Sequence, residues 1–203
     1  EHMGGFARMK ALTGATAILS QAAAEEVATG GRTDFREDGR QQYEPFTADR
    51  IIRDGETVSL GGITLTAHIT PGHTKGCTTY TTTVEDDGRQ VPVVFMCGFA
   101  TPGIDRSWLL DNPKYPDVAR DYQRSFATIR SLPCEAWFYP RATTILLNEK
   151  LAARAAGATR NPFIDPEGCQ WYIDQYEHEF TDQLSQQLRN RAAKRDMARR
   201  RPP

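Results

Sequence analysis

The stretch TPGHTKGC, residues 70–77, carries the strongest signal in this chain. It follows a strand-like run, ITLTAHI at residues 63–69, and places His73 in a tight turn built on Pro71 and Gly72. A side chain at the exit of a strand is rigidly held, and a metal ion needs ligands that are held in that way. The stretch therefore predicts a metal-binding histidine at the end of a strand.

The composition fits one folded domain and narrows the classes of partner. The chain has 203 residues, 25% of them charged, and a formal net charge of −1. This length is enough to bury a core. The balanced charge gives no reason to expect a nucleic-acid partner, and no apolar run is long enough to cross a membrane. We expect a domain over residues 1–190 and a basic, disordered tail over residues 191–203, with a polyanion-binding arm as the alternative for the tail.

Hydrophobic periodicity predicts helices and strands in mixed order, which is typical of a sheet covered by helices. The expected helices lie near residues 6–13, 21–29, 117–131, 148–156 and from about 166 past 188. The expected strands lie at 15–19, 57–60, 63–69, 77–84, 91–97 and 135–139. The run at 91–97 is nearly all apolar and predicts a strand buried on both faces. The polar stretch 32–48 predicts a long loop, which is often functional in a compact domain.

The four cysteines, at positions 77, 97, 134 and 169, do not show the spacing of a cysteine zinc site. No pair is separated by two residues, as zinc-binding cysteine pairs usually are. From the residues alone, the simplest interpretation is four buried thiols.

The TPGHTKGC stretch resembles a zinc-binding turn of the metallo-β-lactamases, and its pattern is nearest to their third subclass. Other segments agree with that subclass in the same order, among them GGF at 4–6, LGG at 60–62, DNP at 111–113, LPC at 132–134 and NPFIDP at 161–166. Agreement in so many separate segments is specific, although each segment alone is a weak signal. The resemblance implies an α/β fold, the αββα sandwich of this family. The opening residues EHMGG resemble the end of the family's H-x-H-x-D-H metal motif, so we expect the N-terminal part to be missing.

The resemblance also implies a function. Metallo-β-lactamases hydrolyse the amide of β-lactams at a zinc site, where the metal lowers the pKa of its bound water to about 7. We therefore expect zinc as the cofactor, a small-molecule β-lactam as the substrate, and a monomeric protein in the periplasm or outside the cell.

The same resemblance assigns roles to individual residues. His73 and His2 stand at metal-ligand positions, and Glu1 stands at the Asp position of the motif, as a metal ligand with a catalytic role. Arg141 falls where the family has a distant histidine ligand, and Gly98 where the subclass usually has a serine; both lie on the substrate side. The Glu1 side chain is longer than Asp by about 1.5 Å, and a guanidinium has no lone pair for a metal.

The resemblance and these departures from it lead to two expectations about the site. The imidazoles of His2 and His73 should lie within about 10 Å of each other, because ligands of one metal cluster must converge. The chain as given should bind zinc weakly or not at all, because a catalytic zinc needs three well-placed protein ligands.

The resemblance suggests one disulfide, between Cys134 and Cys169, because some relatives join the cysteine of the LPC segment to one in the final helix. Such a bridge would stabilise the protein by roughly 3–4 kcal/mol in an oxidising compartment. Cys77 and Cys97 are then expected to stay free and buried.

Two classes of function remain open at this point. The chain is either a hydrolase of the third subclass, impaired or inactive as a fragment, or a divergent member of the fold that is non-catalytic or holds a single metal. A lactonase or thioesterase of the same fold is a further alternative. The alternative interpretation of Arg141 is an ordinary surface residue, and that of His2 is merely a terminal residue. Two histidines at H-x-H spacing before Glu1 would favour hydrolysis.

Overall fold

The computed structural model describes residues 2–35, 42–101 and 109–199. Its main sheet has the strand order β3-β4-β5-β6-β7. The strands are β3 (Thr57–Leu60), β4 (Ile63–Ile69), β5 (Thr78–Asp86), β6 (Arg89–Phe95) and β7 (Ala136–Phe138). Neighbours from β3 to β6 are antiparallel, and β7 joins β6 in parallel. All five strands were predicted from the sequence.

Two tight hairpins set the register of this sheet. Gly61 and Gly62, between β3 and β4, have φ of 58° and 84°. Asp87 and Gly88, between β5 and β6, have φ of 50° and 74°. Positive φ at both central residues is the geometry of the two-residue hairpin turn, and it favours Gly and Asp. The second turn matters for the site, because it brings the start of β5 beside the end of β6.

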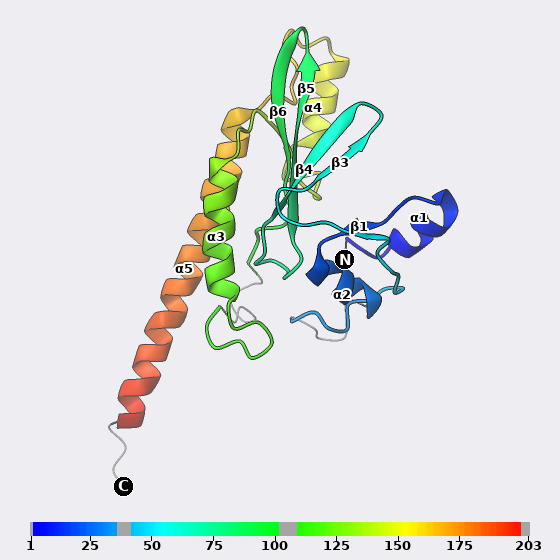
Figure 1. Ribbon diagram of the computed structural model, residues 1–203. Coiled ribbons are helices and arrows are strands. Elements are labelled where there is room, and N and C mark those ends of the chain that lie inside the picture. The colour runs from blue at the N-terminus through cyan, green and yellow to red at the C-terminus, as the bar shows by residue number, and fades with distance from the viewer. Residues whose placement is uncertain (1, 36–41, 102–108, 200–203) are drawn as a thin grey trace.

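Two long helices cover one face of the sheet (Figure 1). They are α3 (Val118–Ser131) and α5 (Pro166–Arg199). Between them and the sheet lies the main core, in which Val94, Trp137, Tyr122, Phe126 and Tyr172 are all at most 3% exposed. Burying a large apolar side chain stabilises a fold by about 1.5–3 kcal/mol, so this layer holds α3 rigidly against the sheet.

The opposite face of the sheet is less completely covered. Val91, Val93 and Ala136 are buried there. Phe95 is 40% exposed, although its ring stacks on Phe138 at 5.2 Å. The prediction that residues 91–97 are buried on both faces is therefore wrong at Phe95, where one side of the strand meets solvent.

The N-terminal segment forms smaller elements. Helix α1 (Phe6–Thr13) ends where predicted, at Gly14 in the left-handed conformation with φ of 66°. Strand β1 (Ile18–Leu19) pairs in parallel with β2 (Arg50–Ile51), and α2 (Gln21–Ala28) lies between them in sequence. The sequence did not predict β2, because two residues are too few to show any periodicity.

The last two helices complete the chain. Helix α4 (Leu147–Ala155) precedes α5, which continues to Arg199. The expected disorder of the tail is therefore wrong for residues 191–199, which are helical; residues 200–203 lie outside the described part. The segment RAAKRDMAR consists mostly of strong helix formers, and Arg191 pairs with Asp111 at 3.4 Å. Within the described residues, no helix is long and apolar enough to cross a membrane.

Two disulfides are present. Cys134 and Cys169 are joined, with Cα atoms 6.5 Å apart, as the resemblance implied. Cys77 and Cys97 are also joined, with Cα atoms 5.7 Å apart, so the prediction that they stay free is wrong. The hairpin register explains this second bridge, because Tyr80 pairs with Phe95 and the ladder, continued outward, places position 78 opposite position 97. Cys77 is one residue from that position.

Candidate metal centre

The TPGHTKGC stretch forms the loop between β4 and β5 and closes on itself. The N–H of Thr70 donates to the carbonyl of Cys77 at 2.9 Å, and the N–H of Gly72 donates to the carbonyl of Thr74 at 3.0 Å. Pro71, Gly72 and Cys77 are buried and His73 is half-buried. The loop is therefore a compact turn that presents His73, in agreement with the sequence-based expectation.

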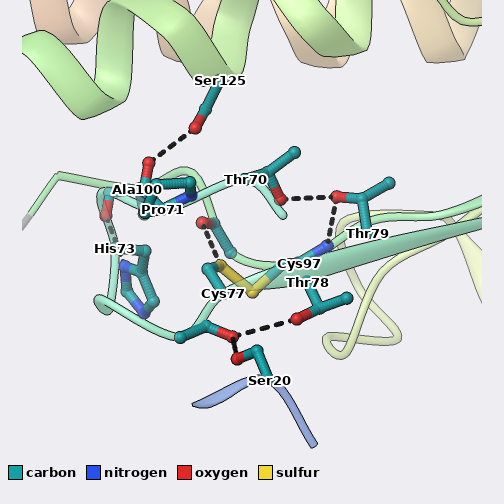
Figure 2. The surroundings of a disulfide bond; sticks show 12 residues. Ser20, Thr70, Pro71, His73, Cys77, Thr78, Thr79, Cys97, Ala100 and Ser125 are labelled. Atoms are coloured by element: carbon teal, nitrogen blue, oxygen red, sulfur yellow. Dashed lines mark hydrogen bonds between the residues drawn. A yellow bond between two sulfur atoms is a disulfide. The ribbon is translucent and has the colours of Figure 1, made fainter. Parts of the chain in front are cut away.

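One hydrogen bond fixes the orientation of the His73 ring. Nδ1 of His73 lies 2.7 Å from the carbonyl oxygen of Ala100 (Figure 2). A carbonyl oxygen only accepts hydrogen bonds, so Nδ1 must carry the proton, and in the neutral ring the lone pair is on Nε2. Metal-binding histidines commonly use this arrangement, with one ring nitrogen bonded to a carbonyl and the other directed at the metal. His73 thus has the tautomer that a metal ligand needs.

Gly98 lies directly against this ring. A Cβ added at Gly98 would sit 2.8 Å from Cδ2 and 3.2 Å from Nε2 of His73. The first distance is shorter than real Cβ contacts and the second is unusually tight, so the imidazole would have to shift to admit a side chain at position 98. The glycine therefore does more than omit the serine hydroxyl of the subclass, because it allows the observed position of the ring.

The Cys77–Cys97 disulfide joins the two segments that surround His73 (Figure 2). Cys77 ends the loop, and Cys97 precedes Gly98. The bridge lies beside a polar contact between Thr70 and Thr79, whose hydroxyl oxygens are 3.0 Å apart, and the N–H of Cys97 donates to the same Thr79 oxygen at 3.4 Å. The far end of the loop is held by Ser20, whose hydroxyl donates to the carbonyl of Gly76 at 2.8 Å.

The other predicted site residues are placed less fully. His2 is exposed overall, although burial of part of its side chain lowers its pKa. Glu1 lies outside the described residues. The convergence of His2 on His73 stays a prediction. Arg141 is exposed in the segment after β7. Burial raises the pKa of Tyr176 in α5, and the positive charge of Arg141 partly opposes that rise, so Arg141 lies near Tyr176.

The two remaining histidines belong to other parts of the structure. His68 lies in β4, and its Nε2 is 2.8 Å from the hydroxyl of Thr81 in the neighbouring strand. His178 lies on the exposed side of α5, with Nε2 3.3 Å from a carboxylate oxygen of Asp182. Over residues 2–35, 42–101 and 109–199, no three His, Cys, Asp or Glu side chains converge in a way that would hold a metal ion.

A cleft of about 460 Å³ is lined in part by Lys75 of the same loop. It is bounded by the start of α2, by β2 and by Lys75, with Ile52 and Ile69 as apolar lining. His73 does not line it, so this cleft and the histidine are separate features of the molecule.

The structure resembles solved metallo-β-lactamases over most of its length. Native FEZ-1 metallo-β-lactamase from Legionella gormanii matches with a TM-score of 0.87 and 34% identity, over 91% of this chain and 70% of that one. A metallo-β-lactamase from Cronobacter sakazakii with a HARLDQ motif matches with a TM-score of 0.84 and 35% identity, over 92% and 69%. BJP-1, a subclass B3 enzyme of Bradyrhizobium japonicum, matches with a TM-score of 0.81 and 29% identity, over 92% and 69%.

The chain belongs to the metallo-β-lactamase superfamily. Its fold is a metallo-β-lactamase fold, and the matched structures include subclass B3 enzymes, as the sequence implied. No family model matches the chain.

The residues that the structure describes do not make a complete zinc site. His73 is poised to be a ligand, but among the described residues no group of three His, Cys, Asp or Glu side chains comes together to hold a metal ion. The supports of His73 were also not predicted from the sequence. A backbone partner such as the Ala100 carbonyl leaves no signal in the sequence.

Proposed function

We propose that the chain contributes the His73 side of the metal site of a zinc-dependent hydrolase that opens the amide of β-lactams, and that it is impaired or inactive as these 203 residues. The observation that carries the proposal is the Nδ1 hydrogen bond of His73 to the Ala100 carbonyl at 2.7 Å. This bond selects the tautomer with its lone pair on Nε2, where a metal would bind. Family membership supports the reaction class.

The incomplete ligand set supports the second half of the proposal. A catalytic zinc normally has three protein ligands, and such a group is absent from the described residues. Glu1 and His2 are the proposed further ligands, with Glu1 as a catalytic residue in the Asp position of the motif. If Arg141 faces the groove, its fixed charge stands where a second metal would be, and it would instead bind the carboxylate of the substrate by paired hydrogen bonds.

The two disulfides support a proposal about the compartment in which the protein works. Disulfides form and persist in oxidising compartments, which supports a periplasmic or secreted protein. We propose that it acts on its small-molecule substrate as a monomer.

The test uses the natural polypeptide that contains these 203 residues. If it carries two histidines at H-x-H spacing before Glu1, we expect it to hydrolyse a chromogenic cephalosporin in the presence of zinc but not in the presence of a chelator. His73→Ala should lower turnover at least 100-fold, because it removes a metal ligand. The matched control is His178→Ala, which removes an exposed histidine of α5 and should change little.

The alternative function is a divergent member that binds one metal without hydrolysis, or none. The position of Arg141 in sequence is the observation that favours it. A polypeptide with the complete histidine motif that binds zinc but leaves the cephalosporin intact would support this alternative and contradict the hydrolase proposal. Hydrolysis of a lactone or thioester by that same polypeptide would instead support the third alternative, a lactonase or thioesterase of the same fold.

A further inference from the structure

The carbonyl of Ala100 accepts two hydrogen bonds from different elements. One comes from Nδ1 of His73 at 2.7 Å. The other comes from the hydroxyl of Tyr122, at 3.2 Å. Tyr122 lies in α3, which packs in the main core, and its side chain is 0% exposed. The group that sets the tautomer of His73 is therefore itself held by a rigid, buried residue.

The ring of Tyr122 also supports the backbone just before His73. A Cβ added at Gly72 would lie 2.8–3.0 Å from three carbon atoms of the Tyr122 ring. Gly72 therefore rests on the face of that ring with no room for a side chain. Its φ of 145° is also rarely adopted by other residues.

A second residue of α3 reaches the same turn. The hydroxyl of Ser125 donates to the carbonyl of Pro71 at 2.6 Å (Figure 2). Ser125 follows Tyr122 by three residues, so both side chains are on one face of the helix. Together these two residues hold Pro71 and Gly72 in place, while the Tyr122 hydroxyl holds the hydrogen-bond partner of the imidazole.

We propose that Tyr122 is the positioning residue for His73. Its ring fixes the backbone from which the imidazole projects, and its hydroxyl fixes the carbonyl that keeps the proton on Nδ1. Changes to such supporting groups usually weaken metal binding or activity by roughly 10–100-fold. Only the effect on metal binding and activity rests on the proposed function. The orientation and tautomer of His73 can be measured whether or not the chain takes up zinc.

The test is long-range ¹H–¹⁵N correlation NMR of the 203-residue chain, at one pH where His73 is neutral. The ¹⁵N shifts of the ring report the ratio of the Nδ1–H to the Nε2–H tautomer. In Tyr122→Phe the ring remains but the hydroxyl is lost, so the Ala100 carbonyl has one anchor fewer. We expect the ratio to fall roughly two- to tenfold, the equivalent of weakening one ordinary hydrogen bond.

The matched control is Tyr115→Phe. Tyr115 is also buried, and its hydroxyl donates to Asp121 at 2.7 Å rather than to Ala100. This control removes a comparable hydrogen bond and should leave the His73 signals unchanged. An unchanged or higher tautomer ratio in Tyr122→Phe would overturn the proposal, and so would an equal change in Tyr115→Phe.

Gly72→Ala tests the same contact from the other side, and decides the matter if Tyr122→Phe does not fold. The added methyl group collides with the Tyr122 ring, so the turn must move away from α3. We expect the tautomer ratio to fall at least as far as in Tyr122→Phe. His73 signals identical to those of the parent chain, in a folded Gly72→Ala protein, would show that this support does not position the imidazole.

Discussion

Among single residues, His73 owes its position and tautomer to the residues that contact it. The sequence predicted the histidine and the turn, because Pro and Gly beside a strand end leave a clear pattern. It did not predict that the imidazole lies on the backbone of Gly98 or bonds to Ala100. Those contacts join positions about 25 residues apart, whose proximity depends on the hairpin between β5 and β6.

A serine at position 98 should displace the imidazole. The Cβ would lie 2.8 Å from Cδ2 of His73, so Gly98→Ser should lower the free energy of unfolding by about 1–3 kcal/mol, as overpacking usually does. Chemical denaturation measures this, and the His73 ring signals in NMR should shift with it. Gly5→Ser is the control, because a Cβ there meets nothing within 4 Å and should change stability by less than about 0.5 kcal/mol. Equal stability of the two variants would contradict the contact.

Arg141→His should restore a ligand if Arg141 faces the groove. In a polypeptide that carries the complete histidine motif, we expect the change to add a second bound zinc and to increase β-lactam turnover, because imidazole offers a lone pair and guanidinium does not. Metal analysis and steady-state kinetics measure the two effects. Arg154→His, on the exposed side of α4, is the control. No gain in either quantity would make Arg141 a surface residue without a role in the site.

At the scale of elements, the hairpin between β5 and β6 explains a bridge that the sequence-based interpretation missed. The turn at Asp87 and Gly88 was recognised, and counting outward from a two-residue turn already places position 78 opposite Cys97, one residue from Cys77. The resemblance to known relatives instead led to the Cys134–Cys169 pair, which is confirmed. The local register was thus the more direct signal for Cys77 and Cys97.

Removing the Cys77–Cys97 bridge should destabilise the protein. Its sequence separation is 20 residues, for which the loss of chain entropy in the unfolded state is worth about 3 kcal/mol. We expect a Cys77→Ser/Cys97→Ser double variant to lose about that much free energy of unfolding in urea under oxidising conditions. In the presence of a reductant, which also opens the Cys134–Cys169 bridge, the difference in stability between the double variant and the parent should disappear. A double variant as stable as the oxidised parent would show that the bridge contributes nothing.

Just before α5 lies a partly buried charge pair that makes stability depend on pH. The carboxylate of Asp165 accepts hydrogen bonds from Nζ of Lys150 at 2.7 Å and from the N–H of Gly168 at 2.9 Å. Burial alone would raise the pKa of Asp165, but these partners outweigh it and hold the pKa below 3.8. The stabilisation is therefore complete above pH 3.8 and is lost as the pH falls through the lower, folded-state pKa.

Asp165→Asn should lower the free energy of unfolding at neutral pH by about 1–3 kcal/mol, because Lys150 loses a charged partner. The variant should also lose less stability than the parent between neutral pH and acid. Urea denaturation at a series of pH values measures both effects. Asp87→Asn, in the exposed hairpin turn, is the control. A pH dependence of Asp165→Asn identical to that of the parent would contradict the role of this pair.

At the scale of the whole molecule, the fold was predictable because many short segments agreed with one family in the same order. The strands and most helix positions also followed from periodicity. Two features did not follow: strand β2, which is too short to show a pattern, and the helical state of residues 191–199, which the sequence-based interpretation assigned to a basic tail. Charge alone is a poor guide there, since alanine, arginine and lysine are all strong helix formers.

Within its described residues, this member of the metallo-β-lactamase superfamily presents one well-positioned histidine without a complete zinc site. Competition for zinc between the purified 203-residue chain and a chromogenic chelator tests this claim most directly. We expect the chelator to retain the zinc, with no stoichiometric uptake by the chain, because a stable site needs three well-placed protein ligands. Tight uptake of one zinc per chain, abolished by His73→Ala, would contradict the claim and show that His73 already has its partners within these residues.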